Sequence, residues 1–163
     1  VGAAIEGRGL LRILATLGRQ PEAESFEAAA AQLRAANAGA FPGVAEAEWL
    51  RHAREIYDAD DAGRPVLSYD PKLRIAVAAS IEAGGGPSVT LWPLFEALKT
   101  CPVLVVRGEN SDILSAETLE KMRREHPGLE AVTLANRGHA PFLTEPEALD
   151  ALERFLSRHL AAG

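Results

Sequence analysis

The sequence contains little cysteine, few basic residues and no long apolar segment. Cys101 is the only cysteine among 163 residues, so neither an intramolecular disulfide nor a multi-cysteine metal site can form. Acidic residues outnumber basic ones by 23 to 17, which argues against a nucleic-acid partner and against binding to anionic membranes. No apolar segment approaches the roughly 20 residues that a membrane-spanning helix needs. We therefore expect no nucleic-acid partner and no membrane contact.

Targeting and metal-binding signals are missing as well. The first residues lack the basic segment and apolar stretch of a secretory signal, which predicts a cytoplasmic protein. The four histidines have no close mutual spacing, so the sequence predicts no metal site and no cofactor. Cys101 precedes an apolar strand and is expected to be a buried, unreactive thiol. A composition of 47% hydrophobic and 25% charged residues is typical of a globular protein with a packed core.

Helix signals dominate the first half of the chain. Gly18 would end the first helix and Ser25 would cap the second. Residues 66–69 favour a short extended piece, and the glycine-rich residues 84–87 form the clearest break. The apolar spacing predicts helices over residues 10–17, 26–36, 44–57 and 70–80.

From about residue 91 the pattern changes to strands that alternate with helices. A short helix is expected over residues 91–98. The valine-rich residues 102–106 predict a strand buried on both faces of a parallel sheet, and residues 131–134 predict a second strand. Ser115 would begin the helix between them, and Pro146 suits the first turn of the last helix. The order predicts an α/β protein with a right-handed βαβα unit. The last helix has an apolar stripe of Leu149, Leu152, Phe155, Leu156 and Leu160.

The loops after the two predicted strands carry the residues best suited to chemistry. His139 follows the second strand, after a glycine, Gly138, that allows an unusual backbone turn. Asp112 follows the first strand. Since neighbouring parallel strands end about 5 Å apart at one sheet edge, the Asp112 carboxylate could reach the imidazole. The two would then be the acid and the base of a nucleophile–base–acid triad. Glu109 is a competing acid, and a plain turn aspartate and loop histidine are the alternative reading.

Other candidate residues have simpler interpretations. His52 is expected to be structural or exposed, with a substrate contact as its alternative. His126 suits a helix end, where the helix dipole favours a cation. Trp49 is expected in a core, and Phe142 is a candidate for touching a substrate.

Residues 102–115 and 138–147 together resemble the carboxyl-terminal part of the α/β-hydrolase fold family. In that family, the loop after one late strand carries the triad acid and the loop after the last strand carries the triad histidine. Asp112 and His139 match these positions. Residues 1–86 resemble the helical cap or lid of many members, and residues 87–163 the end of the core. The resemblance implies a partial α/β-hydrolase fold, with a helical cap followed by a βαβα unit of a parallel sheet.

The sequence departs from the family in one large respect. The nucleophile elbow, Gly-x-Ser-x-Gly, does not occur in it. In the family the nucleophile precedes the acid, and everything upstream of Asp112 resembles the cap. We therefore expect a chain that is the cap and carboxyl-terminal half of a hydrolase. Its expected partner is the amino-terminal half, either missing or on another chain. Without a nucleophile and an oxyanion hole, the chain alone should be inactive.

The resemblance implies a hydrolase that acts on an ester, a thioester or a similar small apolar carbonyl substrate. Two alternatives stay open. The protein could be a non-catalytic module of the same fold that binds a small molecule or a protein. It could also be a dehalogenase or epoxide hydrolase, whose elbow nucleophile is an aspartate.

A two-stranded sheet would leave an edge of the strand at residues 102–106 unpaired. We expect the isolated chain to self-associate, to bind another chain or to aggregate. Size-exclusion chromatography with light scattering should therefore give a mass above that of the monomer. A monodisperse monomer that unfolds cooperatively would contradict this expectation.

Overall fold

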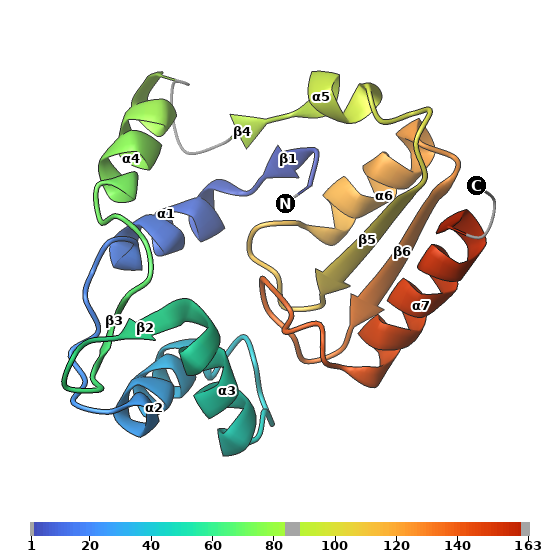
Figure 1. The fold of residues 1–163 in the computed structure, drawn as a ribbon. Helices are drawn as coiled ribbons and strands as arrows, with labels where there is room; N and C mark the ends of the chain where they lie inside the picture. The colour runs from blue at the N-terminus through green and yellow to red at the C-terminus, as the bar shows by residue number, and fades with distance from the viewer. Residues whose placement is uncertain (1, 84–88, 161–163) are drawn as a thin grey trace. The chain divides into compact units, whose positions relative to one another are not determined.

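The computed structural model describes residues 2–83 and 89–160 (Figure 1). Two compact units make up the chain, and the division between them falls within the first helix. One unit contains Val1–Leu10 and Pro87–Gly163, and the other contains Leu11–Gly86. The break predicted at residues 84–87 lies outside the described residues. Whether residues 1–86 act as a cap stays a prediction.

Local capping signals set the helix ends of the unit at residues 11–86. The Ser25 hydroxyl oxygen accepts a 3.2 Å hydrogen bond from the N–H of Ala28, which confirms Ser25 as a helix cap. Gly18 follows the end of the first helix with φ of +75°, a left-handed conformation that favours glycine. The elements are α1 (Gly7–Thr16), α2 (Phe26–Asn37), α3 (Glu46–Ile56), β2 (Tyr57–Ala59), β3 (Pro65–Leu67) and α4 (Leu73–Ala83).

One element of this unit differs from the sequence-based expectation. Only the second strand of the antiparallel β2–β3 hairpin was expected, because residues 57–59 follow directly on a helix. The carboxylate of Asp60 organises the turn. Its Oδ1 accepts hydrogen bonds from the N–H groups of Ala62 (2.9 Å) and Arg64 (2.8 Å), and its Oδ2 pairs with the Arg64 guanidinium. The acidic residues Asp58, Asp60 and Asp61 therefore belong to a hairpin and its turn.

The core of the same unit lies where α2 packs against α3. Trp49 is buried, as expected, and meets Phe41 edge to face, with ring centroids 5.7 Å apart. Ala29 and Ala30 of α2 and Ala53 of α3 are buried as well. Small side chains let the two helices approach closely, which explains why an alanine-rich segment can form part of a core.

The other unit contains the predicted βαβα arrangement. Strands β5 and β6 are parallel and in register from Val103 opposite Leu129 to Gly108 opposite Leu134. In Figure 1, α6 lies on one side of this pair of strands and α7 on the other. A short antiparallel pair, β1 with β4, precedes them. The elements are β1 (Ala4–Ile5), β4 (Val89–Thr90), α5 (Trp92–Glu96), β5 (Val103–Gly108), α6 (Ala116–Glu125), β6 (Leu129–Leu134) and α7 (Pro146–Leu160).

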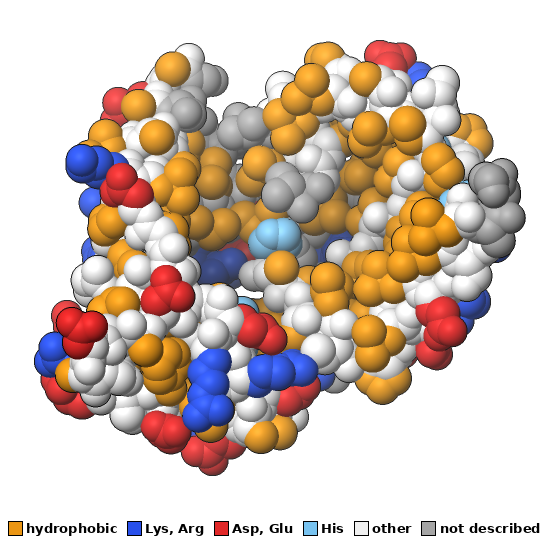
Figure 2. Space-filling view, in the orientation of Figure 1, with side chains coloured by type: hydrophobic (Ala, Val, Ile, Leu, Met, Phe, Trp, Pro, Cys, Tyr) orange, Lys and Arg blue, Asp and Glu red, His pale blue; other side chains and the backbone are white. Residues whose placement is uncertain are grey.

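Burial in this unit differs from two expectations. The valines of β5 are only half-buried, because β5 pairs with β6 alone among the described strands. On α7, Ala148 and Ala151 are buried, whereas three leucines of the predicted stripe are exposed: Leu149, Leu156 and Leu160, the last at 73%. Figure 2 shows apolar side chains gathered over this helix. Ala3, Phe95, Leu114 and Met122 form a cluster of buried side chains in this unit.

None of the described helices is long and apolar enough to cross a membrane.

Gly108, the last residue of β5, is a point of very close contact. A Cβ atom on this residue would lie 2.2 Å from the carbonyl oxygen of Gly138 and 2.3 Å from that of Arg137. Both are backbone atoms, which cannot move aside as a flexible side chain can. Only glycine lets the loop after β6 rest on the end of β5 in this way.

We predict that Gly108→Ala destabilises the protein by about 1–3 kcal/mol, as overpacked sites do. Urea unfolding of the variant measures this loss. Gly128→Ala is the matched control, since its Cβ would meet only the ring of His126, at 3.6 Å. Equal midpoints for the two variants would show that the contact at Gly108 relaxes easily.

Candidate functional site

Two loops meet at the carboxyl ends of β5 and β6. The N–H of Glu109 donates to the carbonyl of Leu134 (2.9 Å), and the N–H of Asn110 donates to the carbonyl of Arg137 (2.8 Å). Together with the contact at Gly108, these bonds join residues 109–114 to residues 135–145. The structure thus brings together the two loops that carry Asp112 and His139, as the sequence predicted.

The Asp112 loop is held by its own side chains and by a buried arginine. The Ser111 hydroxyl accepts hydrogen bonds from the N–H groups of Ile113 (3.3 Å) and Leu114 (3.1 Å). Arg107, buried at the end of β5, donates to the carbonyls of Leu114 (2.8 Å) and Glu109 (3.1 Å). These bonds cross the loop and fix its backbone around the partly buried Asp112.

The first turn of α1 packs directly against the same loop. A Cβ on Gly9 would lie 2.2 Å from the carbonyl oxygen of Asp112, so the helix backbone and the loop backbone touch there. The N–H of Glu6 also donates to the carbonyl of Ile113 (3.0 Å). Because Asp112 is supported from both sides, the position of its backbone is well defined.

Glu109, the competing acid, has a structural partner. Its exposed carboxylate accepts a 3.0 Å hydrogen bond from the N–H of Asn136, in the other loop. Asn136 has φ of 57°, in the left-handed region that asparagine tolerates better than most residues. The Glu109 carboxylate therefore stabilises the turn that begins the His139 loop.

His139 is partly buried in the loop between β6 and α7. The sequence assigned the unusual backbone of this loop to Gly138. The left-handed residues are instead Asn136 and Leu143, at φ of 57° and 60°. The carbonyl of Gly138 is in close contact with Gly108 of β5, so the backbone next to His139 rests on the neighbouring strand.

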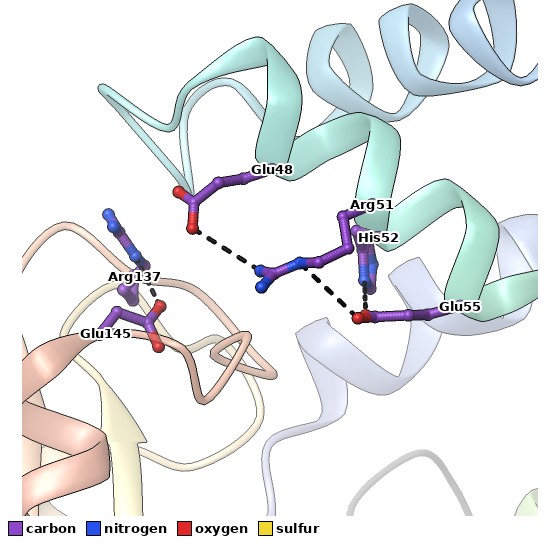
Figure 3. Close-up of polar contacts among 6 residues, drawn as sticks. All are labelled: Glu48, Arg51, His52, Glu55, Arg137 and Glu145. Carbon is purple, nitrogen blue, oxygen red and sulfur yellow. Dashed lines mark hydrogen bonds and ion pairs between the residues drawn. The ribbon is translucent and has the colours of Figure 1, made fainter.

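An ion pair that the sequence did not reveal closes the His139 loop. The Nε of Arg137 donates to Oε1 of Glu145 at 2.7 Å, and the two side chains are 19% and 8% exposed (Figure 3). Arg137 also donates to the carbonyl of Asn136 (3.1 Å). The only sequence signal was an arginine and a glutamate on either side of His139, which is too common a pattern to predict a contact.

His126 and Cys101 lie together near the amino-terminal ends of the strands, away from the two loops. Cys101 precedes β5 in the sequence, and His126 precedes β6. His126 is the C-cap residue of α6, as expected at a helix end. Its ring is buried, and Nε2 lies 3.0 Å from the carbonyl of Leu98 and 3.1 Å from that of Cys101. Cys101 itself is exposed, so the expectation of a buried thiol is wrong. It lies in the turn before β5 begins, where the chain has not yet entered the sheet.

His52 belongs to a separate polar group on α3. Arg51 lies between Glu48 (3.6 Å) and Glu55 (3.7 Å), and Nδ1 of His52 is 3.7 Å from the Glu55 carboxylate (Figure 3). Burial lowers the pKa of His52 below its ordinary value, against the opposing effect of Glu55. Within residues 2–83 and 89–160, no group of three or more His, Cys, Asp and Glu side chains could hold a metal ion.

Comparisons with known proteins find relatives that match nearly the whole chain, although no family model matches it. The 3-hydroxybutyrate-oligomer hydrolase of Cupriavidus necator is 30% identical, over 96% of this chain and 54% of that protein. The structure of an α/β hydrolase from Novosphingobium aromaticivorans is 42% identical, with a TM-score of 0.83 over 97% of this chain and 54% of that one. E-2-(acetamidomethylene)succinate hydrolase is 28% identical, with a TM-score of 0.68 over 94% of this chain and 53% of that one.

These similarities confirm the α/β fold class and the resemblance recognised in the sequence. The chain belongs to the α/β-hydrolase fold family. It spans about half the length of the relatives that it matches. The catalytic roles of Asp112 and His139 stay predictions.

The lowered pKa of His52 predicts a loss of stability in mild acid. The unfolded chain, with an ordinary histidine pKa of about 6.5, binds a proton at a higher pH than the folded chain does. Stability should therefore fall as the pH drops below about 6.5 and recover above it. Between about pH 5 and pH 7.5, the urea midpoint should change less with pH in His52→Gln than in the unchanged protein. It should change more in Glu55→Gln, which lacks the opposing charge. An equal change with pH in all three proteins would show that His52 does not cause the loss of stability.

Proposed function

We propose that this chain carries the acid and the base of a hydrolase triad. His139 is the general base and acid, and Asp112 orients its ring. The nucleophile is contributed by residues outside this chain. The observation that carries the proposal is the joining of the two loops at the ends of β5 and β6, because it holds the backbones next to both residues against one another.

The chemistry needs His139 to move one proton in two directions. The imidazole takes the proton of the nucleophile as that group attacks the substrate carbonyl. It then gives the proton to the leaving alcohol, so that the acyl group stays on the nucleophile. Water repeats the sequence and releases the acid. The carboxylate of Asp112 holds the ring in the required tautomer and stabilises its charged form.

An ester is the substrate class with the most support. The relative from Cupriavidus necator is named for oligomers of 3-hydroxybutyrate, and hydroxy acids in such oligomers are joined by ester bonds. The first substrates to assay are therefore the dimer and trimer of 3-hydroxybutyrate, beside a simple nitrophenyl ester. A thioester is the second class. The unit at residues 11–86 would cover the substrate as a cap.

Two other functions fit the same fold. A non-catalytic binding module would keep both loops without using a nucleophile, and a dehalogenase or epoxide hydrolase would use an aspartate. A fluorophosphonate probe on the natural full-length protein separates these from a serine hydrolase. Labelling that an ester substrate prevents supports the serine enzyme, and a lack of labelling supports the others.

We predict that His139→Ala, in the full-length protein, lowers kcat by about three orders of magnitude or more, because the members of a triad act as a unit. Asp112→Asn should cause a similar loss by favouring the wrong tautomer of the histidine. Ester hydrolysis under saturating substrate measures both effects. His159→Gln is the control, since this exposed residue lies near the end of α7 and contacts Glu130 at 3.6 Å.

Glu109→Gln distinguishes the two candidate acids. Glutamine can still accept the hydrogen bond from the N–H of Asn136, so the loop should keep its shape. Its activity should stay within about tenfold of the natural protein, whereas that of Asp112→Asn should not. The reverse order would identify Glu109 as the acid, and normal activity in His139→Ala would end the triad proposal.

A further inference from the structure

We propose that the ion pair between Arg137 and Glu145 is a positioning device, which sets where His139 lies relative to Asp112. This inference rests on the proposed function, since it concerns the same histidine. Neither residue of the pair touches the reacting atoms. The pair acts through the backbone of the loop that carries His139.

The ion pair spans the loop at its base. Arg137 stands two residues before His139 and Glu145 six residues after it, and their side chains are joined at 2.7 Å. The loop is thereby closed into a ring by one charge-assisted hydrogen bond, the strong class of such bonds. The pair limits how far the backbone at His139 can shift, because a movement of either end stretches this bond.

Both ends of the pair are anchored to other parts of the unit. The carbonyl of Arg137 accepts the N–H of Asn110, two residues before Asp112, at 2.8 Å. At the other end, the carbonyl of Glu145 accepts the N–H groups of Ala148 and Leu149 (both 3.0 Å), in the first turn of α7. The pair therefore connects the Asp112 loop, the His139 loop and the start of the last helix.

Holding the loop with this ion pair has a free-energy cost. Glu145 is 8% exposed, and its second oxygen, Oε2, is buried and has no hydrogen-bond partner among the described residues. An unpaired buried acceptor costs free energy, and a buried ion pair is often no more stabilising than apolar residues of similar size. Stability alone therefore explains the pair poorly. The pair instead restricts geometry, since the N–H groups of the planar guanidinium donate hydrogen bonds only in fixed directions.

A second ion pair, between the strand and the helix on either side of the His139 loop, offers a comparison. Arg158 of α7 pairs with Glu130 of β6, and the side chains are 57% and 30% exposed. This pair lies near the ends of the strand and the helix that are far from both loops. It is solvated, as most surface ion pairs of little energetic value are. Breaking it removes an ion pair between the two flanking elements without changing the His139 loop.

The test is steady-state ester hydrolysis by variants of the full-length protein. Arg137→Met removes the guanidinium but keeps an unbranched side chain. It should lower kcat by about 10- to 100-fold, as small misplacements of catalytic groups do, and change KM by less than about threefold. The limb of the pH profile of kcat/KM that depends on His139 should move, because the ring no longer meets Asp112 in the same way. Glu145→Gln, which can still accept from Arg137, should retain most of the activity.

Arg158→Met is the matched control and should leave kcat, KM and the pH profile unchanged. The double variant Arg137→Met/Glu145→Leu removes both charges of the pair together and replaces them with apolar side chains. It should be folded, with a melting temperature near or above that of the natural protein, yet have the same low kcat as Arg137→Met. The double variant therefore tests the positioning role even if the single variant Arg137→Met, which leaves the buried Glu145 carboxylate without its partner, does not fold.

The outcomes separate this inference from the function on which it rests. Wild-type kcat and an unmoved pH profile in the double variant, with His139→Ala inactive, would overturn the positioning role alone. An active His139→Ala would overturn the triad itself. A parallel loss of kcat and melting temperature in the double variant would show that the pair only stabilises the fold, which also contradicts the inference.

Discussion

The contact between Gly108 and the backbone at residues 137–138 is the constraint on which the rest of the site depends. It allows the end of β5 and the loop after β6 to touch at distances that a side chain would prevent. Hydrogen bonds from Glu109 and Asn110 then tie the two loops together. Without this contact, the loop of Asp112 and the loop of His139 would lie at the same edge of the sheet, but their backbones would not touch.

Charged side chains near this contact act mainly on the backbone. Arg107 bonds to two carbonyls of the Asp112 loop, and Glu109 accepts an N–H of the His139 loop. Arg137 and Glu145 bond to each other across the loop. The other ion pairs among the described residues have at least one exposed side chain, for example Arg158 with Glu130 and Arg51 with Glu55. The charged side chains near the contact form the supporting layer that a site on loops needs, because loops have no ladder of regular hydrogen bonds to hold them.

Much of the fold could be predicted because its signals are local. Ser25 and Ser115 cap helices through hydrogen bonds to residues three positions away, and the valine-rich run of β5 forms a strand. The errors arose where a distant or unexpected partner decided the outcome. The β2–β3 hairpin depends on how Asp60 bonds across its turn. The half-buried state of β5 depends on which strands pair with it, and that is a property of the assembled sheet.

The sequence by itself determined the family, the βαβα order and the two residues proposed for the triad, since short motifs and the alternation of strands and helices express all three. Only the tertiary structure decided that Glu109 supports a turn, that Cys101 is exposed and that Arg137 pairs with Glu145. Each of these outcomes depends on atoms brought together from separate parts of the chain. Residue type and spacing specify which bonds a side chain can make, but the packing of strands and loops selects which bonds it does make.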